Sequence, residues 1–164
     1  MWSFLEFYTT RHGGWPPLNV LVYNLLLMTC WFYTLLRGGA PERLGATILL
    51  IFSWLTVAAI RHATKFQFLE TGVLVVDLFC LAAFVILALR ADRFWPLWVA
   101  ALQVLGVAVH GIKLAEPALI PRTYAFMLAI WSYPMILLMI IGTWRHRTRL
   151  IRFGADQSWS QASK

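Results

Sequence analysis

Five apolar runs, each close to the length needed to cross a bilayer, constrain this chain more than any other feature. They cover approximately residues 18–36, 44–60, 70–89, 94–112 and 124–144. A helix needs about 20 residues to cross about 30 Å of hydrocarbon, and in lipid a span must satisfy its own backbone groups. We therefore expect an all-α, polytopic transmembrane helical bundle of about five spans. Because the second and third runs are near the short limit, a four-span bundle is the alternative.

The composition agrees with lipid as the solvent. Hydrophobic residues make up 60% of the 164 residues and charged residues 13%, whereas soluble domains are about 25% charged. The nine Trp and five Tyr suit the membrane–water boundary. The net charge of +7 would suggest nucleic acid in a soluble protein. Here the basic residues flank apolar runs, so we interpret them as a topology signal and expect no nucleic acid partner.

The chain divides into three parts. Residues 1–16 are predicted to form an interfacial N-terminal segment, because this stretch is aromatic and too short to span. Residues 17–144 form the predicted bundle, and residues 145–164 a basic cytoplasmic tail. Pro134 lies inside the last run and should kink that helix, since proline removes a backbone hydrogen bond.

The distribution of Lys and Arg predicts the orientation. Five spans put the termini on opposite sides, and one side then collects nine basic residues: Arg37, Arg43, Arg90, Arg93, Arg145, Arg147, Arg149, Arg152 and Lys164. The other side collects five: Arg11, Arg61, Lys65, Lys113 and Arg122. The positive-inside rule places the C-terminus in the cytoplasm and the N-terminus outside, in a plasma membrane or a bacterial inner membrane.

Four arginines follow the last run within Trp144–Phe153. Arg145, Arg147, Arg149 and Arg152 alternate with apolar residues, and we expect this segment to continue the helix into the interface. There the arginines can bind anionic lipid head groups. The alternative is a stop-transfer anchor with no specific ligand.

Polar residues inside apolar runs are the candidate functional residues, because they are costly in hydrocarbon and usually face the bundle interior. Helical spacing puts Glu70 and Asp77 on one face of the third run and aligns a stripe on the fourth. The predicted network comprises Asn19, Glu70, Asp77, Gln103 and His110, and the stripe on the fourth run also includes Gly106 and Lys113.

A short turn joins the third and fourth runs, so these helices should pack antiparallel. Residues equidistant from the turn then lie at equal depth. Glu70 with His110, and Asp77 with Gln103, are both centred on position 90. We therefore predict that Glu70 faces His110 near the outer surface. Asp77 should face Gln103 about 10 Å deeper, at about 1.5 Å per residue.

The sequence predicts no cofactor. His12, His62 and His110 could hold haem or a metal in a bundle, but none forms an HxxxH or ExxH pair. Cys30 and Cys80 lie within apolar runs and form no CxxC motif, so they are expected to pack as small apolar residues.

Three functions remain open. A phosphate loop, a GxSxG elbow and an HExxH motif are all missing from the sequence, which favours a non-enzymatic accessory or structural subunit of a larger membrane complex. The partner would be another membrane protein or a second copy. The first alternative is a proton- or ion-conducting pore or small transporter using Asp77, Gln103 and His110. The second is a haem- or metal-binding subunit using His62 and His110.

Overall fold

The computed structural model describes residues 18–60, 69–91 and 93–154, and its regular elements there are all helices. They are α2 (Leu18–Arg37), α3 (Ala40–Ile60), α4 (Thr71–Arg90), α5 (Trp95–Ala115), α6 (Pro121–Ile130) and α7 (Ser132–Phe153). In length and hydropathy, the described residues provide five candidate spans, with α6 and α7 forming the fifth together. The all-α prediction with five spans is confirmed, and the chain is a small polytopic membrane protein. The predicted interfacial segment, residues 1–16, lies outside the described residues.

Several helices extend beyond their predicted ends. Helix α3 begins at Ala40 and not near Leu44, because Pro41 and Glu42 both suit a first turn. Proline lacks an N–H that would go unpaired there, and a carboxylate is favourable at a helix N-terminus. Helix α7 continues to Phe153 as predicted, and it ends where Gly154 adopts a left-handed φ of 67°.

The fifth span is interrupted at Trp131. Helix α6 ends at Ile130 and α7 begins at Ser132. Pro134 has no N–H to donate to the Ile130 carbonyl, and its ring crowds that carbonyl. The helix is therefore interrupted one turn before the proline, and the predicted kink itself stays a prediction.

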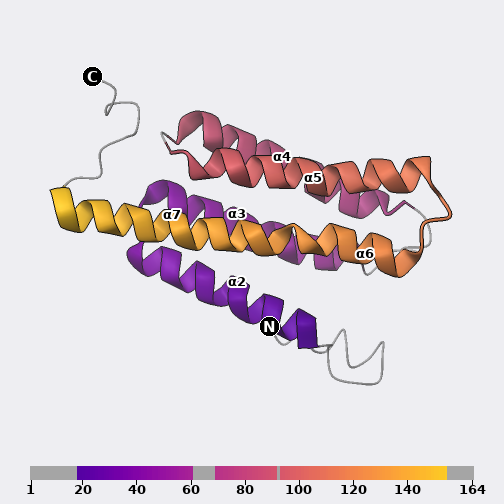
Figure 1. Ribbon diagram of the computed structural model, residues 1–164, viewed down its shortest axis with the longest axis horizontal. Helices are drawn as coiled ribbons and strands as arrows, with labels where there is room; N and C mark the ends of the chain where they lie inside the picture. Colours follow the sequence, from indigo (N-terminus) through magenta and orange to yellow (C-terminus); the bar gives the residue numbers. More distant parts are fainter. Residues whose placement is uncertain (1–17, 61–68, 92, 155–164) are drawn as a thin grey trace.

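The helices run roughly along one common axis (Figure 1). Helices α4 and α5 form the predicted antiparallel hairpin, and α3 packs against α2, α4 and α7. Helix α7 also contacts α2 and α5, so α3 and α7 occupy the centre of the bundle. We call the end where α2 connects to α3 the Gly38 end, and the end where α5 connects to α6 the Glu116 end.

Apolar side chains face outward from the bundle as well as into its core. Leu25, Phe79, Leu89 and Leu114 are 65–80% exposed, which suits side chains that contact lipid. The buried apolar core is small, and within it some helices pack very closely against one another. A Cβ added at Gly45 would lie 2.5 Å from Trp95, and one at Gly142 would lie 2.9 Å from it. The two glycines thus let α3 and α7 approach the indole closely.

Candidate functional site

A chain of three hydrogen-bonded side chains crosses the interior at the Glu116 end. His110 on α5 places Nε2 3.1 Å from Asp77 Oδ2 on α4. The hydroxyl of Tyr124 on α6 lies 2.7 Å from His110 Nδ1. His110 is 2% exposed and Tyr124 fully buried, while the Asp77 side chain is 19% exposed.

Both imidazole nitrogens are engaged, which limits the possible proton arrangements. With a neutral ring, Nε2–H donates to the carboxylate and Nδ1 accepts from the Tyr124 hydroxyl. With a protonated ring, both nitrogens donate, and the tyrosine oxygen accepts. The two arrangements share the same heavy-atom positions. A proton can therefore arrive at His110 without moving the ring.

Gln103 fixes the second carboxylate oxygen of Asp77. Its Nε2 donates to Asp77 Oδ1 at 3.4 Å and to the Asp77 carbonyl oxygen at 3.3 Å. The predicted pairing of Asp77 with Gln103 is therefore confirmed. The predicted stripe on α5 is also confirmed as one buried face: Gln103, Gly106, His110 and Lys113.

The predicted pairing of Glu70 with His110 is wrong, because His110 bonds to Asp77. Glu70 is not part of α4. It precedes the first turn with a non-helical φ of −83° and ψ of 83°, so the helical spacing used to align it does not apply. Glu70 is nevertheless buried, and its backbone hydrogen-bonds to Tyr124. Sequence reasoning did not include Tyr124, which lies in the first turn of α6.

Lys113 holds the connection between α5 and α6 through hydrogen bonds. Its Nζ donates to the carbonyl oxygens of Pro117 and Leu119, each at 2.8 Å. These bonds close the C-terminal end of α5 and hold the connection to α6. The ammonium group also lies 5.9 Å from the centre of the Tyr124 ring, so it borders the hydrogen-bonded chain.

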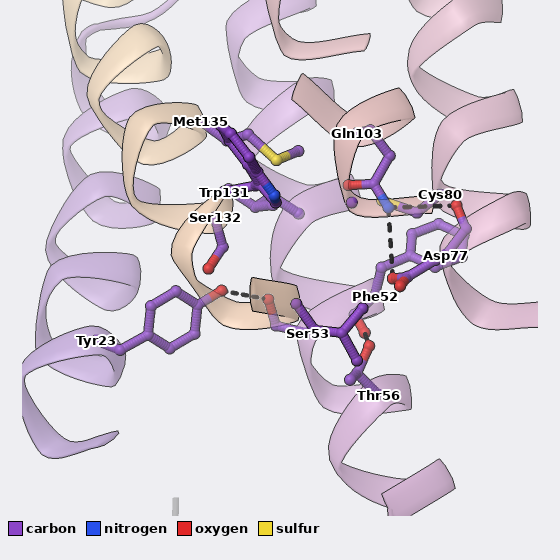
Figure 2. Close-up of a pocket in the computed structure, with 13 residues that line it drawn as sticks. Tyr23, Phe52, Ser53, Thr56, Asp77, Cys80, Gln103, Trp131, Ser132 and Met135 are labelled. Atoms are coloured by element: carbon purple, nitrogen blue, oxygen red, sulfur yellow. Dashed lines mark hydrogen bonds between the residues drawn. The ribbon is translucent and has the colours of Figure 1, made fainter. Parts of the chain in front are cut away.

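A cavity of about 100 Å³ adjoins Asp77 (Figure 2). Its wall mixes apolar residues with polar ones: Tyr23, Ser53, Thr56, Asp77, Gln103, Trp131 and Ser132. The Tyr23 hydroxyl lies 2.9 Å from Ser53 Oγ, which links α2 to α3. Trp131 Nε1 is a buried donor with no hydrogen-bond partner in the described part of the chain. The break before Pro134 is what puts this indole and Ser132 on the cavity wall.

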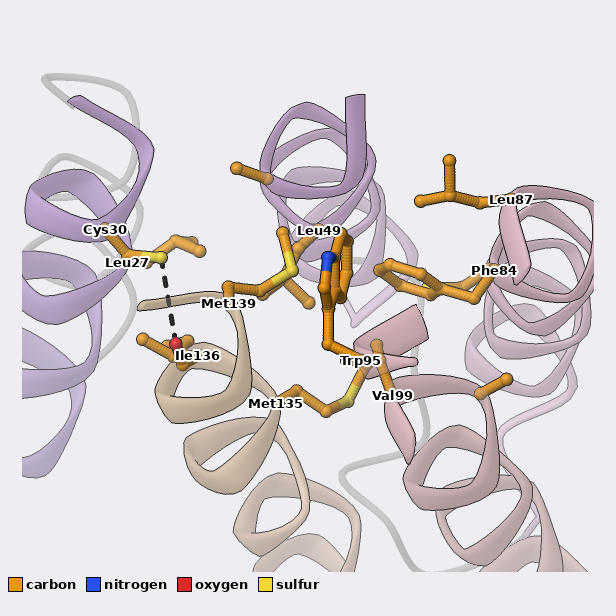
Figure 3. Close-up of a cluster of buried hydrophobic side chains, with 13 residues drawn as sticks. Leu27, Cys30, Leu49, Phe84, Leu87, Trp95, Val99, Met135, Ile136 and Met139 are labelled. Atoms are coloured by element: carbon orange, nitrogen blue, oxygen red, sulfur yellow. Dashed lines mark hydrogen bonds between the residues drawn. The ribbon is translucent and has the colours of Figure 1, made fainter. Parts of the chain in front are cut away.

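An apolar layer follows the cavity toward the Gly38 end (Figure 3). On each helix, its residues lie closer to the Gly38 end than the polar cavity residues do. The layer is built by Leu27, Phe84, Trp95, Val99, Met135, Ile136 and Met139, all less than 9% exposed. It separates the polar cavity from the opposite end of the bundle.

A second buried acid lies beyond this layer. Glu42 is fully buried, and it accepts one bond from Trp95 Nε1 and one from the Gly39 N–H, each 3.1 Å long. His146 on α7 packs beside it. A Cβ added at Gly39 would lie 2.8 Å from the imidazole and 3.0 Å from a Glu42 oxygen. Sequence reasoning treated Glu42 as a helix-opening residue and missed its burial.

His12 and His62 lie outside the described residues, as does the Asn19 side chain. Haem or metal ligation by His110 would require breaking one of its two hydrogen bonds. Within residues 18–60, 69–91 and 93–154, no group of three or more His, Cys, Asp or Glu is arranged to hold a metal.

The four arginines of the predicted lipid site lie on the last turns of α7. Arg145 and Arg152 are exposed, and Arg147 and Arg149 are partly exposed. All four lie at the Gly38 end of the bundle.

Comparison with protein-family models, curated proteins and solved structures finds no match. The functional argument therefore proceeds from the chemistry of the buried polar groups.

Proposed function

We propose that the protein is a small proton transporter in which Asp77 exchanges a proton within the half of the bundle next to the Glu116 end. The hydrogen-bonded chain of Tyr124, His110 and Asp77 is the observation that carries this proposal. Ionisable groups inside a span are costly and are commonly used for proton relays. An imidazole can accept a proton at one ring nitrogen and donate one from the other, so His110 is placed to pass a proton to Asp77.

The apolar layer favours alternating access over an open pore. Protons need polar groups or water along their path, and the buried side chains of Phe84, Val99 and Met139 offer neither. Passage to the Gly38 end would require the helices to rearrange. The interruption at Trp131 provides a hinge, because helix ends absorb such changes in backbone angles.

Proton uptake into liposomes containing a trapped pH dye tests this proposal. With an imposed gradient, we expect the wild-type protein to acidify the lumen. Asp77→Asn, which keeps the side chain's size, should reduce the rate at least tenfold. Glu116→Gln is the control, because Glu116 is exposed and takes no part in the hydrogen bonds that link Tyr124, His110 and Asp77. Circular dichroism and gel filtration verify folding. Undiminished uptake by folded Asp77→Asn contradicts the proposal.

An accessory structural role is the second candidate. The observation favouring it is that the same hydrogen bonds join α4, α5 and α6, and such bonds stabilise membrane helices by about 0.6–2 kcal/mol each. If the protein is an accessory subunit, liposomes that contain the wild-type protein show no proton uptake. Asp77→Asn then lowers only the unfolding temperature, and mass measurement of the native complex in mild detergent reveals a second polypeptide.

A further inference from the structure

We propose that the cavity beside Asp77 binds a small group of water molecules that joins the carboxylate to the hydroxyl pair of Tyr23 and Ser53. That water occupies the cavity does not depend on the proposed function. That this water conducts protons rests on the proposed function. The water would extend the polar chain laterally across the bundle, from α4 and α5 to α2 and α3.

The cavity has the size and polarity that buried water requires. A water molecule occupies about 30 Å³ in the liquid and needs two to four polar partners. The volume of about 100 Å³ therefore has room for more than one molecule. An apolar cavity of this size would stay dry, but this wall carries a carboxylate, an amide, an indole N–H and several hydroxyl groups.

The indole of Trp131 supplies an unused donor. An indole N–H donates only, and unlike a hydroxyl it cannot rotate about a single bond to find another partner. Trp131 Nε1 is buried without a hydrogen-bond partner in the described part of the chain. Figure 2 shows the indole beside Ser132 on the cavity wall. A water oxygen is the smallest acceptor that can satisfy it there.

The surrounding groups supply the acceptors. Ser132 already donates to the Ala129 carbonyl and Thr56 to the Phe52 carbonyl, so their oxygens remain able to accept. Asp77 offers carboxylate lone pairs in addition to those used by Gln103 and His110. Water that accepts from Trp131 can therefore donate to these oxygens. Each molecule then has the several partners that fix it in place.

Two methionines provide an internal test of hydration. Met135 belongs to the apolar layer and also lines the cavity, whereas Met139, one turn later on α7, belongs to the layer without lining the cavity, and both are at most 2% exposed. Radiolytic hydroxyl-radical labelling generates radicals from bound water. We expect Met135 and Trp131 to be labelled several-fold faster than Met139. Equal, low labelling of the two methionines would overturn the inference.

Two glycines on α5 provide a matched pair of variants. A Cβ at Gly106 or at Gly111 meets no atom within 4 Å, so both substitutions fit. Gly106 lines the cavity, while Gly111 is exposed. Gly106→Ala should take the space of about one water and lower Met135 labelling at least twofold, whereas Gly111→Ala should leave it unchanged. Equal labelling in both variants would refute a cavity-bound water group.

Proton uptake separates this inference from the proposed function. If Met135 is labelled but wild-type liposomes take up no protons, the hydration site stands and the proposed function fails. If uptake occurs and Gly106→Ala slows it several-fold relative to Gly111→Ala, the water group belongs to the route. Uptake at the same rate in both variants removes the water from the route.

Discussion

Buried polar side chains in this bundle fall into two chemical environments. Asp77 is linked to other titratable side chains and borders a cavity. Glu42 instead accepts an indole N–H and a backbone N–H within a tightly packed corner that also holds His146 and does not border the cavity. A chain of titratable groups can move a proton, while a carboxyl held by two fixed donors orders the structure around it. We therefore expect Asp77 to serve the proposed function and Glu42 to stabilise the fold.

Replacing Glu42 by alanine tests that assignment. The variant leaves the buried Trp95 Nε1–H and the partly buried Gly39 N–H without their acceptor, and a fully buried unsatisfied donor costs about 1–3 kcal/mol. We expect a marked fall in unfolding temperature in detergent, measured by circular dichroism, and proton uptake that survives below that temperature. Glu116→Ala, at an exposed position, should change the unfolding temperature little. Equal stability of the two variants would contradict the structural role.

A second prediction at the scale of single residues concerns the stability of a Gly45 variant. A methyl group there would lie 2.5 Å from the Trp95 ring and 2.8 Å from the Met139 methyl. Overpacking costs about 1–3 kcal/mol, more than the gain of up to about 1 kcal/mol in helix propensity. Gly45→Ala should therefore lower the unfolding temperature, whereas Gly111→Ala should keep or raise it. A stabilised Gly45→Ala would show that Trp95 can move aside.

The sequence predicts those parts of the site that depend on spacing along one helix or across one short turn, and it does not predict those that depend on packing between distant helices. Spacing along single helices identified the buried α5 stripe, and the hairpin turn correctly paired Asp77 with Gln103. The pairing of Glu70 with His110 failed because Glu70 precedes α4. Tyr124 and Trp131 were not predicted, since their positions depend on how the fifth span packs against the hairpin. A local pattern contains no information on that packing.

At the scale of helices, spans are easier to predict than their ends. Lipid requires about 20 apolar residues for each crossing, so the five spans were correctly predicted. The ends depend on capping interactions. Helix α5 extends to Ala115, beyond the predicted end, and Lys113 then bonds to carbonyl oxygens of the following connection. The long lysine side chain makes these bonds possible, and spacing does not reveal them.

Removing the Lys113 bonds should loosen the connection between α5 and α6. Lys113→Met keeps the apolar stem and removes two charge-assisted bonds, each worth about 1.5–3 kcal/mol. Hydrogen exchange of residues 116–124 should accelerate at least tenfold, while exchange within α2 stays unchanged. Arg122→Met, at an exposed position of the same region, is the control. Unchanged exchange in Lys113→Met would show that the connection is held by its other contacts.

For the molecule as a whole, the two ends of the bundle differ in charge and in polarity of the interior. The hydrogen-bonded chain and the cavity lie toward the Glu116 end, and the apolar layer lies between them and the Gly38 end. The basic turns of α7 are at the Gly38 end. On the proposed function, and in the orientation given by the positive-inside rule, Asp77 would exchange its proton with the outer side and the apolar layer would face the cytoplasmic side.

Cysteine accessibility tests that orientation. Ala118 and Arg152 are exposed at opposite ends of the bundle, and the native Cys30 and Cys80 are buried, so the background should be low. In intact cells, a membrane-impermeant maleimide should label Ala118→Cys but label Arg152→Cys only after permeabilisation. The reverse pattern would place the chain of Asp77, His110 and Tyr124 toward the cytoplasm. Labelling of both variants from one side would contradict a membrane crossing by α6 and α7, because this single span separates positions 118 and 152.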